Sequence, residues 1–199
     1  MRVLQLLPEL KFGGVERGTV DLSEHLTKLG HQSAVVSAGG GLTEHLSNHG
    51  AKHFTLPIAK KNFLAIKQYK NLRDIYREFK PDIIHVRSRF PAWINVLALK
   101  GLSSSKPIVI STFHGLYSKP FYSKSMSYAN DIIAISKTVQ KYVFKNYDVD
   151  HSRVHLIYRG CDVDEFNTSA PSGAWSNSWH KEFPQTSDKI LLTLPGRIT

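Results

Sequence analysis

Short apolar runs alternate with stretches of helical periodicity along this chain, and this alternation constrains the fold more than any other feature. Seven runs are short and rich in β-branched residues, and they are predicted to be strands: residues 3–7, 33–37, 53–56, 83–86, 108–112, 132–135 and 154–158. Strands without alternating polar residues are typical of a parallel sheet that is covered on both faces. The sequence therefore predicts an α/β fold with a parallel β-sheet of about seven strands flanked by helices.

Helical patterns fill the intervals between these runs. The clearest covers residues 15–29 and ends at Gly30, a residue that readily takes the positive φ of a helix C-cap. A second helix is predicted over residues 62–79, ending before Pro81. Two shorter helices are predicted at residues 92–99 and 137–147, the latter with Ser136 as its N-cap.

The chain is strongly basic, and this charge indicates what it binds. It carries 26 Lys and Arg against 16 Asp and Glu, a net charge of +10. Anionic lipids, phosphorylated substrates and nucleic acids all suit such a surface, but no aromatic–basic interleaving or nucleic-acid-binding motif is visible, so no nucleic-acid partner is expected. One face of the 62–79 helix gathers several of the basic residues: Lys60, Lys61, Lys67, Lys70, Arg73 and Arg77. That face is either a solvated surface or a contact with an anionic membrane.

The cellular setting is predicted from features that are missing. No secretory signal is visible at the amino terminus, and no run approaches the roughly 18 apolar residues of a membrane span. The single cysteine, Cys161, excludes an internal disulfide and is expected to be structural. We expect a cytoplasmic protein whose membrane contacts, where present, are peripheral on the inner face of the cell membrane.

Glycines follow the first predicted strand and precede the first helix. Gly13 and Gly14 would let backbone N–H groups approach a ligand at a helix N-terminus, where an anion is favoured. Glu16 then lies in the first helical turn. The G-x-G-x-x-G fingerprint of dinucleotide-binding proteins is absent. The segment is either a phosphate-binding turn or simply a tight turn.

Polar residues also follow two other predicted strands. Arg87, Ser88 and Arg89 come after the strand at 83–86, and His114 comes after the strand at 108–112. Ligands of open α/β sheets bind at the carboxyl ends of the strands, so these side chains are candidates for holding an anionic group. The alternatives are a solvated loop for the arginines and a structural role for the histidine.

Three histidines have a spacing that suggests metal binding but lack a complete ligand set. His45, His49 and His53 are four residues apart, yet Gly50 interrupts the run and His53 begins a predicted strand. No acidic partner is evident in the sequence, so no metal site is expected. No cofactor is expected either.

The sequence changes character after the seventh strand. Residues 1–168 are predicted to form the Rossmann-like domain, and residues 169–188, rich in Ser, Pro, Gly, Asn and Trp, a linker or insertion. Residues 189–194 form an apolar run with no place in the first sheet. Residues 189–199 are therefore predicted to begin a second, truncated domain.

Taken together, several segments resemble the family 4 glycosyltransferases, two-domain enzymes of the GT-B architecture. The matching segments appear in the family's order: Gly13-Gly14-Val15-Glu16-Arg17, Asp82-Ile83-Ile84-His85, Thr112-Phe113-His114-Gly115, Ile132-Ile133-Ala134-Ile135-Ser136, residues 154–166, and Gly196-Arg197. The resemblance implies a nucleotide-diphosphate sugar donor and an acceptor bound mainly by this domain. It also implies transfer with retention of anomeric configuration and without a required metal.

The resemblance assigns roles to individual residues. Gly13, Gly14 and Glu16 would bind the donor diphosphate, His114 would be the catalytic residue near the transferred sugar, and Arg197 would neutralise the leaving group. The expected acceptor-binding residues are Arg87, Ser88, Arg89 and Arg159. Arg159 departs from the family pattern, which often has Asn there, and suggests a phosphorylated acceptor.

These features predict the amino-terminal half of a hexosyltransferase that acts on an envelope glycolipid, such as a lipopolysaccharide core, or on a phosphorylated glycan. The rest of the nucleotide-binding domain would lie beyond Thr199, so the fragment alone is expected to be inactive. The alternative is a non-enzymatic α/β domain that binds a small molecule.

Overall fold

The computed structural model describes residues 1–60, 62–102, 106–117, 120–161, 163–164, 169 and 171–192. The chain divides into two compact units, Met1–Arg159 and Gly160–Thr199. The first unit ends nine residues before the predicted domain border at residue 168.

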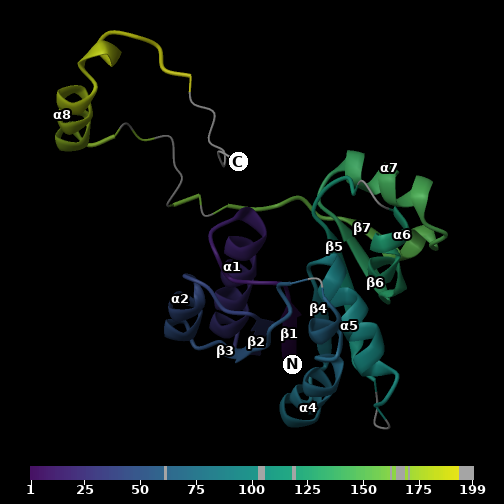
Figure 1. Cartoon of the computed structure of the whole chain (residues 1–199). Coiled ribbons are helices and arrows are strands. Elements are labelled where there is room, and N and C mark those ends of the chain that lie inside the picture. Colours follow the sequence, from purple (N-terminus) through teal and green to yellow (C-terminus); the bar gives the residue numbers. More distant parts are fainter. Residues whose placement is uncertain are drawn as a thin grey trace. The chain divides into compact units, whose positions relative to one another are not determined.

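The first unit is built on one sheet of seven parallel strands in the order β3-β2-β1-β4-β5-β6-β7 (Figure 1). The strands are β1 Arg2–Leu6, β2 Gln32–Ser37, β3 Lys52–Thr55, β4 Ile83–Val86, β5 Ile108–Phe113, β6 Asp131–Ala134 and β7 Val154–Leu156. Each overlaps a predicted strand, with ends shifted by at most two residues. The predicted α/β, Rossmann-like fold is confirmed.

Helices connect the strands. They are α1 Gly14–Lys28, α2 Thr43–Asn48, α3 Phe63–Ile66, α4 Tyr69–Phe79, α5 Arg89–Leu99, α6 Pro120–Ser123 and α7 Lys137–Asn146, with short 3₁₀ turns at Lys124–Tyr128 and His151–Arg153. The predicted caps are confirmed at two helices. Gly30 ends the first helix with a φ of 78°, and the Ser136 hydroxyl accepts a hydrogen bond from the N–H of Val139.

Apolar side chains cover both faces of the sheet. On one face, Leu4 and Leu6 of β1 pack in a cluster that includes Leu72 of α4 and Ile94 of α5. On the other, Val35 of β2 packs with residues of α1 and α2. Full burial of one such side chain stabilises the fold by about 1.5–3 kcal/mol. Because both faces of the sheet are covered, the strand sequences are continuous apolar runs.

The single helix predicted over residues 62–79 is wrong, because the structure breaks it into α3 and α4. At the break the N–H of Gln68 bonds to the carbonyl of Ala65, and the N–H of Lys70 bonds to that of Lys67. These i to i−3 bonds replace the i to i−4 bonds of an α-helix, so the helix axis ends here. Lys61, part of the predicted basic face, lies outside the described residues.

The second unit contains a helix where only a linker or insertion was predicted. Helix α8, Gly173–Glu182, begins with the Ser172 hydroxyl accepting a bond from the N–H of Trp175. The Trp175 and Trp179 rings stack with centroids 5.5 Å apart. A capped start and an i,i+4 aromatic pair stabilise a short helix that composition alone does not reveal.

The predicted strand at residues 189–194 is not seen where the structure describes it. Residues 189–192 form no strand, and Ile190 and Leu192 are almost fully exposed. All strand pairs of the described residues lie between Arg2 and Leu156. Arg197 lies outside the described residues. Cys161, expected to be structural, is exposed.

Candidate functional site

The carboxyl ends of the parallel strands bring most of the predicted site residues to one edge of the sheet. Leu6 of β1 pairs with Val86 of β4, and Val86 pairs with Ser111 of β5. Because these strands run in register, the segments that follow them begin at the same edge. Those segments carry Gly13, Gly14, Arg87 and His114.

Two arginines from distant parts of the chain meet at the first turn of α1. Arg159, beyond β7, donates a hydrogen bond to the carbonyl of Gly14. A Cβ added at Gly18 would lie 2.7 Å from Nη2 of Arg159 and 3.3 Å from Nη2 of Arg87. Arg159 is exposed and Arg87 is buried. The absence of a side chain at Gly18 therefore makes room for a pair of guanidinium groups beside α1.

Gln5 anchors the buried member of this pair. Its Oε1 accepts a hydrogen bond of 3.0 Å from Nη1 of Arg87. Its amide nitrogen donates to the carbonyl of Thr19 at 2.9 Å and to the hydroxyl of Ser23 at 2.8 Å. Burial, together with the charge of Arg159, lowers the pKa of Arg87 to about 10, so the guanidinium stays charged at neutral pH.

His114 presents a neutral imidazole at the same edge. Both ring nitrogens are buried and have no hydrogen-bond partner within the described residues. Burial lowers the pKa of His114 to about 3, and the charges of Arg87 and Arg159 contribute to the shift. A neutral imidazole has one N–H donor and one acceptor nitrogen. Both can serve a ligand that reaches them.

Gly13 and Glu16 are in close contact at the start of α1. A Cβ added at Gly13 would lie 2.4 Å from Oε2 of Glu16, so a larger residue would displace this carboxylate. The negative charges of Asp21 and Glu16 offset part of the fall in the pKa of Arg87. The site therefore combines positive groups, the N-terminus of a helix and a nearby carboxylate.

Arg89 belongs to a separate set of contacts. Its guanidinium lies over the rings of Tyr117 and Tyr122, 4.7 and 5.3 Å from their centroids. The N–H of His114 donates to the Tyr117 hydroxyl at 3.4 Å, so Arg89 braces the loop that carries the histidine. Ser88 is the N-cap residue of α5, but its side chain makes no capping bond. Arg89 makes no contact with Arg159 among the interactions of the described residues.

The sequence prediction missed Gln5 and His85. His85 is a buried residue of β4 whose Nε2 lies 2.7 Å from the hydroxyl of Thr112. Burial, then the charges of Arg87 and His114, hold its pKa well below the usual value. A polar residue inside an otherwise apolar strand was the available signal for both.

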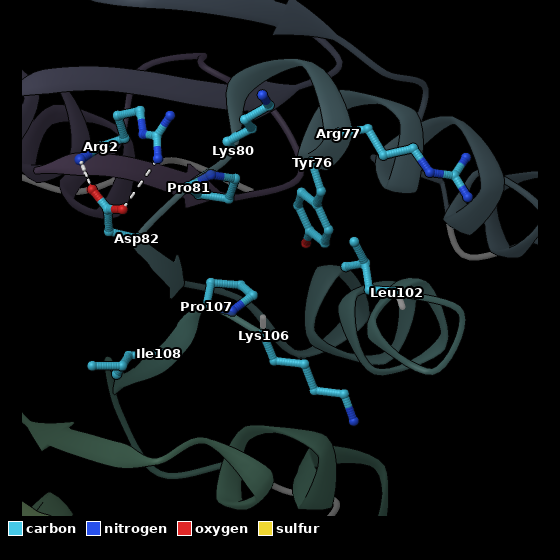
Figure 2. A pocket seen from close by; sticks show the side chains of 10 residues that line it. All are labelled: Arg2, Tyr76, Arg77, Lys80, Pro81, Asp82, Leu102, Lys106, Pro107 and Ile108. Atoms are coloured by element: carbon cyan, nitrogen blue, oxygen red, sulfur yellow. Dashed lines mark hydrogen bonds and ion pairs between the residues drawn. The ribbon is translucent and has the colours of Figure 1, made fainter. Parts of the chain in front are cut away.

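A pocket at the other edge of the sheet is not part of this site. Arg2, Asp82 and Ile108, at the amino ends of β1, β4 and β5, help to line it (Figure 2). Basic residues surround it: Arg77, Lys80 and Lys106. The backbone N–H of Arg2 donates to Asp82 at 2.6 Å and is the main cause of the lowered pKa of that carboxyl. Because parallel strands separate the two edges, a ligand in this pocket lies away from His114.

The arrangement suits a ligand with both an anionic and a neutral polar part. Arg87, Arg159 and the N-terminus of α1 favour phosphate oxygens. The neutral ring of His114 favours a hydroxyl group.

Within the described residues, no helix is both long and apolar enough to cross a membrane.

Comparisons with known proteins identify the family of this chain. The model of Glycosyltransferase Family 4 matches residues 12–165. A glycosyltransferase from Rickettsia africae shares 30% identity with a TM-score of 0.78, over 94% of this chain and 50% of that one. No curated protein sequence matches the chain.

More distant structures share the fold. HepE from Anabaena, solved with UDP-glucose, is 16% identical with a TM-score of 0.73, over 94% of this chain and 50% of its own. The lipopolysaccharide outer core galactosyltransferase WaaB is 16% identical with a TM-score of 0.67, over 82% of this chain and 47% of its own. The chain thus spans about half the length of these structures. With a family model that covers most of its length, the chain belongs to Glycosyltransferase Family 4.

Proposed function

We propose that this chain is the acceptor-side half of a glycosyltransferase that moves a sugar from a nucleotide-diphosphate donor to an envelope glycolipid or phosphorylated glycan. One observation carries the proposal. Arg87 and Arg159 converge on the first turns of α1, and the neutral His114, with both ring nitrogens unpaired within the described residues, lies at the same sheet edge. A sugar diphosphate needs both kinds of partner.

The donor diphosphate would lie at the N-terminus of α1. Gly13 and Gly14 carry no side chain there: the Glu16 carboxylate lies beside Gly13, and Arg159 bonds directly to the carbonyl of Gly14. We therefore group Arg159 with the donor residues Gly13, Gly14 and Glu16 as well as with the acceptor. Arg197, assigned to the donor by its motif, would add a further positive charge. HepE, which shares the fold, was solved with UDP-glucose.

In the proposed reaction, the bond between the anomeric carbon and the diphosphate oxygen breaks, and the diphosphate leaves with the electron pair. The acceptor hydroxyl forms the new bond on the same face of the sugar and gives its proton to the departing diphosphate oxygen, so the anomeric configuration is retained. Arg159, Arg87 and the helix N-terminus stabilise the charge that develops on the leaving group. No metal is needed for this step.

His114 would position the sugar in this reaction. A base whose pKa is about 3 is too weak to hold the acceptor's proton at neutral pH. A hydrogen bond from the imidazole to a sugar hydroxyl fits its buried, uncharged state. His114 therefore contributes to catalysis by orienting the transferred sugar.

Ser88, Arg89 and Arg87 would contact the acceptor. The basic chain suits a phosphorylated or lipid-linked acceptor, and WaaB, which shares the fold, is a lipopolysaccharide galactosyltransferase. Lys60, Lys70 and Arg77 are exposed and would meet an anionic surface. Arg73 does not belong to this exposed set, because its guanidinium donates hydrogen bonds to the carbonyls of Ala98 and Leu97.

Flotation with liposomes tests the membrane contact. More chain should float with anionic than with neutral vesicles, and the replacement of Lys60 and Lys70 by Gln should remove the difference. Equal recovery with both vesicle types would rule out the contact. The proposed cytoplasmic location, peripheral on the inner face of the cell membrane, depends on this result.

Calorimetric titration with uridine and guanosine diphosphates tests the transferase proposal. It requires the two-domain protein, in which residues 189–199 would begin the nucleotide-binding half. We expect one of the two nucleotides to bind, and we expect the 199-residue chain alone to show no sugar transfer. If the two-domain protein binds neither nucleotide, a non-enzymatic small-molecule-binding role is the better explanation.

A further inference from the structure

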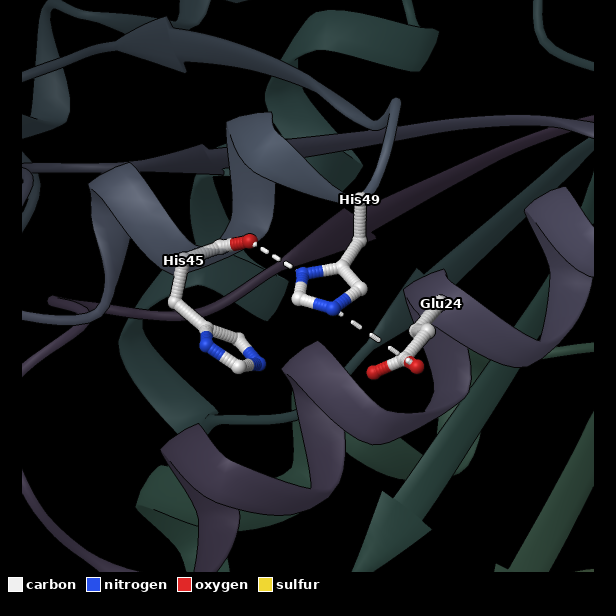
Figure 3. A group of neighbouring side chains, drawn as sticks. All are labelled: Glu24, His45 and His49. Atoms are coloured by element: carbon white, nitrogen blue, oxygen red, sulfur yellow. Dashed lines mark hydrogen bonds and ion pairs between the residues drawn. The ribbon is translucent and has the colours of Figure 1, made fainter.

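Glu24, His45 and His49 form a cluster on the packed helices α1 and α2, apart from the proposed transfer site (Figure 3). Glu24 comes from the third turn of α1, His45 from α2, and His49 directly follows α2. One potential ligand atom from each residue lies within 4.8 Å of the others. The expectation that no acidic residue joins the histidines is therefore wrong. The partner is 21 residues upstream of His45 and reaches it only through helix packing.

Hydrogen bonding leaves the right atoms available. Nδ1 of His49 lies 2.7 Å from the carbonyl oxygen of His45. A carbonyl can only accept, so Nδ1 carries the proton, and the neutral ring has its lone pair on Nε2. That Nε2 lies 3.7 Å from Oε1 of Glu24. A backbone carbonyl that orients a histidine in this way is typical of metal ligands.

The other two groups complete the set. Nε2 of His45 is buried and has no hydrogen-bond partner within the described residues. Oε1 of Glu24 lies 2.8 Å from Nζ of Lys28 and 3.7 Å from Nε2 of His49.

From this geometry, we propose that Glu24, His45 and His49 bind a divalent transition-metal ion of the zinc type. Two imidazoles and one carboxylate form the ligand set of an open tetrahedral zinc site, with water as the fourth ligand. Ligand atoms in such a site lie about 3.3 Å apart, so the side chains need to close by on the order of 1 Å.

The ion would join α2 to α1. Glu24 is ten residues beyond Gly14, about 15 Å along the helix, so the ion does not reach the transfer site. Its role is to fix the helix that carries Gly14 and Gly18. Histidine ligands exclude a preference for Mg²⁺ or Ca²⁺, which take oxygen ligands.

Binding of Co²⁺ and Zn²⁺ to the untagged, chelator-treated chain tests the proposal. We expect one ion per chain, the visible absorption of four- or five-coordinate Co²⁺, and a higher Tm with Zn²⁺. His45→Ala, His49→Ala and Glu24→Ala should each weaken Co²⁺ binding by more than about tenfold. His25→Ala, an exposed histidine next to Glu24 in the sequence, is the matched control and should bind like the wild type.

The result can be separated from a folding defect. Circular dichroism and the Tm in chelator should be the same for all four variants and the wild type, because the side chains are at most partly buried. His45→Gln and His49→Gln replace any alanine variant that does not fold. Equal Co²⁺ affinity in the wild type and the cluster variants, or no binding by the wild type, would overturn the site.

Discussion

The side chain of Gln5 accepts a hydrogen bond of 3.0 Å from Arg87, although 82 residues separate the two. Gln5 is fully buried in the middle of β1, and Arg87 follows β4. A polar side chain inside the sheet thus fixes the position of a charged group at its edge. A buried guanidinium that loses this partner bears an uncompensated desolvation cost.

We predict that Gln5→Leu, which keeps the volume but removes the hydrogen bonds, destabilises the chain. The loss should be roughly 1–3 kcal/mol, because Arg87, Thr19 and Ser23 each lose a partner. Urea unfolding followed by circular dichroism measures it. Gln32→Leu, at an exposed position of β2, should change stability by no more than about 0.5 kcal/mol. Similar effects of the two substitutions would disprove the anchoring role.

The pH dependence of stability should reflect His114. Its pKa is about 3 in the folded chain and about 6.5 when unfolded, so the unfolded state binds more protons between these values. The contribution of the neutral His114 to stability is therefore fully present above pH 6.5 and is lost as the pH falls toward 3. In His114→Gln this loss should be smaller, by at most about 3 kcal/mol at pH 4. Denaturant midpoints of the wild type and the variant at pH 7 and pH 4 measure this difference. An equal loss of stability in the two proteins between pH 7 and pH 4 would contradict the buried, neutral state of His114.

Gly18→Ala should weaken nucleotide-diphosphate binding without lowering the stability of the chain. Alanine in a helix interior is favoured over glycine by up to about 1 kcal/mol, so the Tm should stay equal or rise. The new methyl group would displace the exposed guanidinium of Arg159, whose Nη2 it would approach to 2.7 Å, so nucleotide-diphosphate affinity of the two-domain protein should fall. Gly173→Ala, which meets no atom within 4 Å, serves as the control for affinity. Unchanged affinity in Gly18→Ala would show that the arginine pair does not bind the donor.

Arg73→Ala should destabilise the chain although the sequence places Arg73 on a basic surface. Arg73 satisfies the carbonyls of Ala98 and Leu97 near the end of α5. We expect a loss of about 1–2 kcal/mol in urea unfolding, against no more than about 0.5 kcal/mol for the exposed Lys70→Ala. Equal losses of stability in the two variants would show that Arg73 belongs to the solvated basic face instead.

The sequence was sufficient to predict the seven strands of the sheet and the edge that carries most of the candidate site residues. Buried parallel strands are continuous apolar runs, and the residues that follow them share one edge, so Gly13, Arg87 and His114 could be grouped in advance. The contacts between those segments depend on tertiary packing. Neither the bond from Arg159 to Gly14 nor the approach of Glu24 to His45 has a signal in local spacing.

The sequence did not predict local structure correctly where short-range hydrogen bonds and ring contacts, rather than hydrophobic periodicity, decide the conformation. Tight i to i−3 bonds end α3 within an amphipathic stretch, and a serine cap with a tryptophan pair forms α8 in a segment of loop-like composition. Such features involve single hydrogen bonds and ring contacts of about 1 kcal/mol each, which periodicity does not detect.

The affinity of the two-domain protein for its nucleotide diphosphate, compared between Arg159→Ala and Arg2→Ala, tests the central claim most directly. Arg2 lies at the opposite edge of the sheet, where it pairs with Asp82. Loss of a charge-assisted bond to phosphate should weaken binding by about 10- to 100-fold in Arg159→Ala. Arg2→Ala should bind like the wild type. Equal affinity of Arg159→Ala and the wild type would contradict a donor site at the carboxyl edge of the sheet.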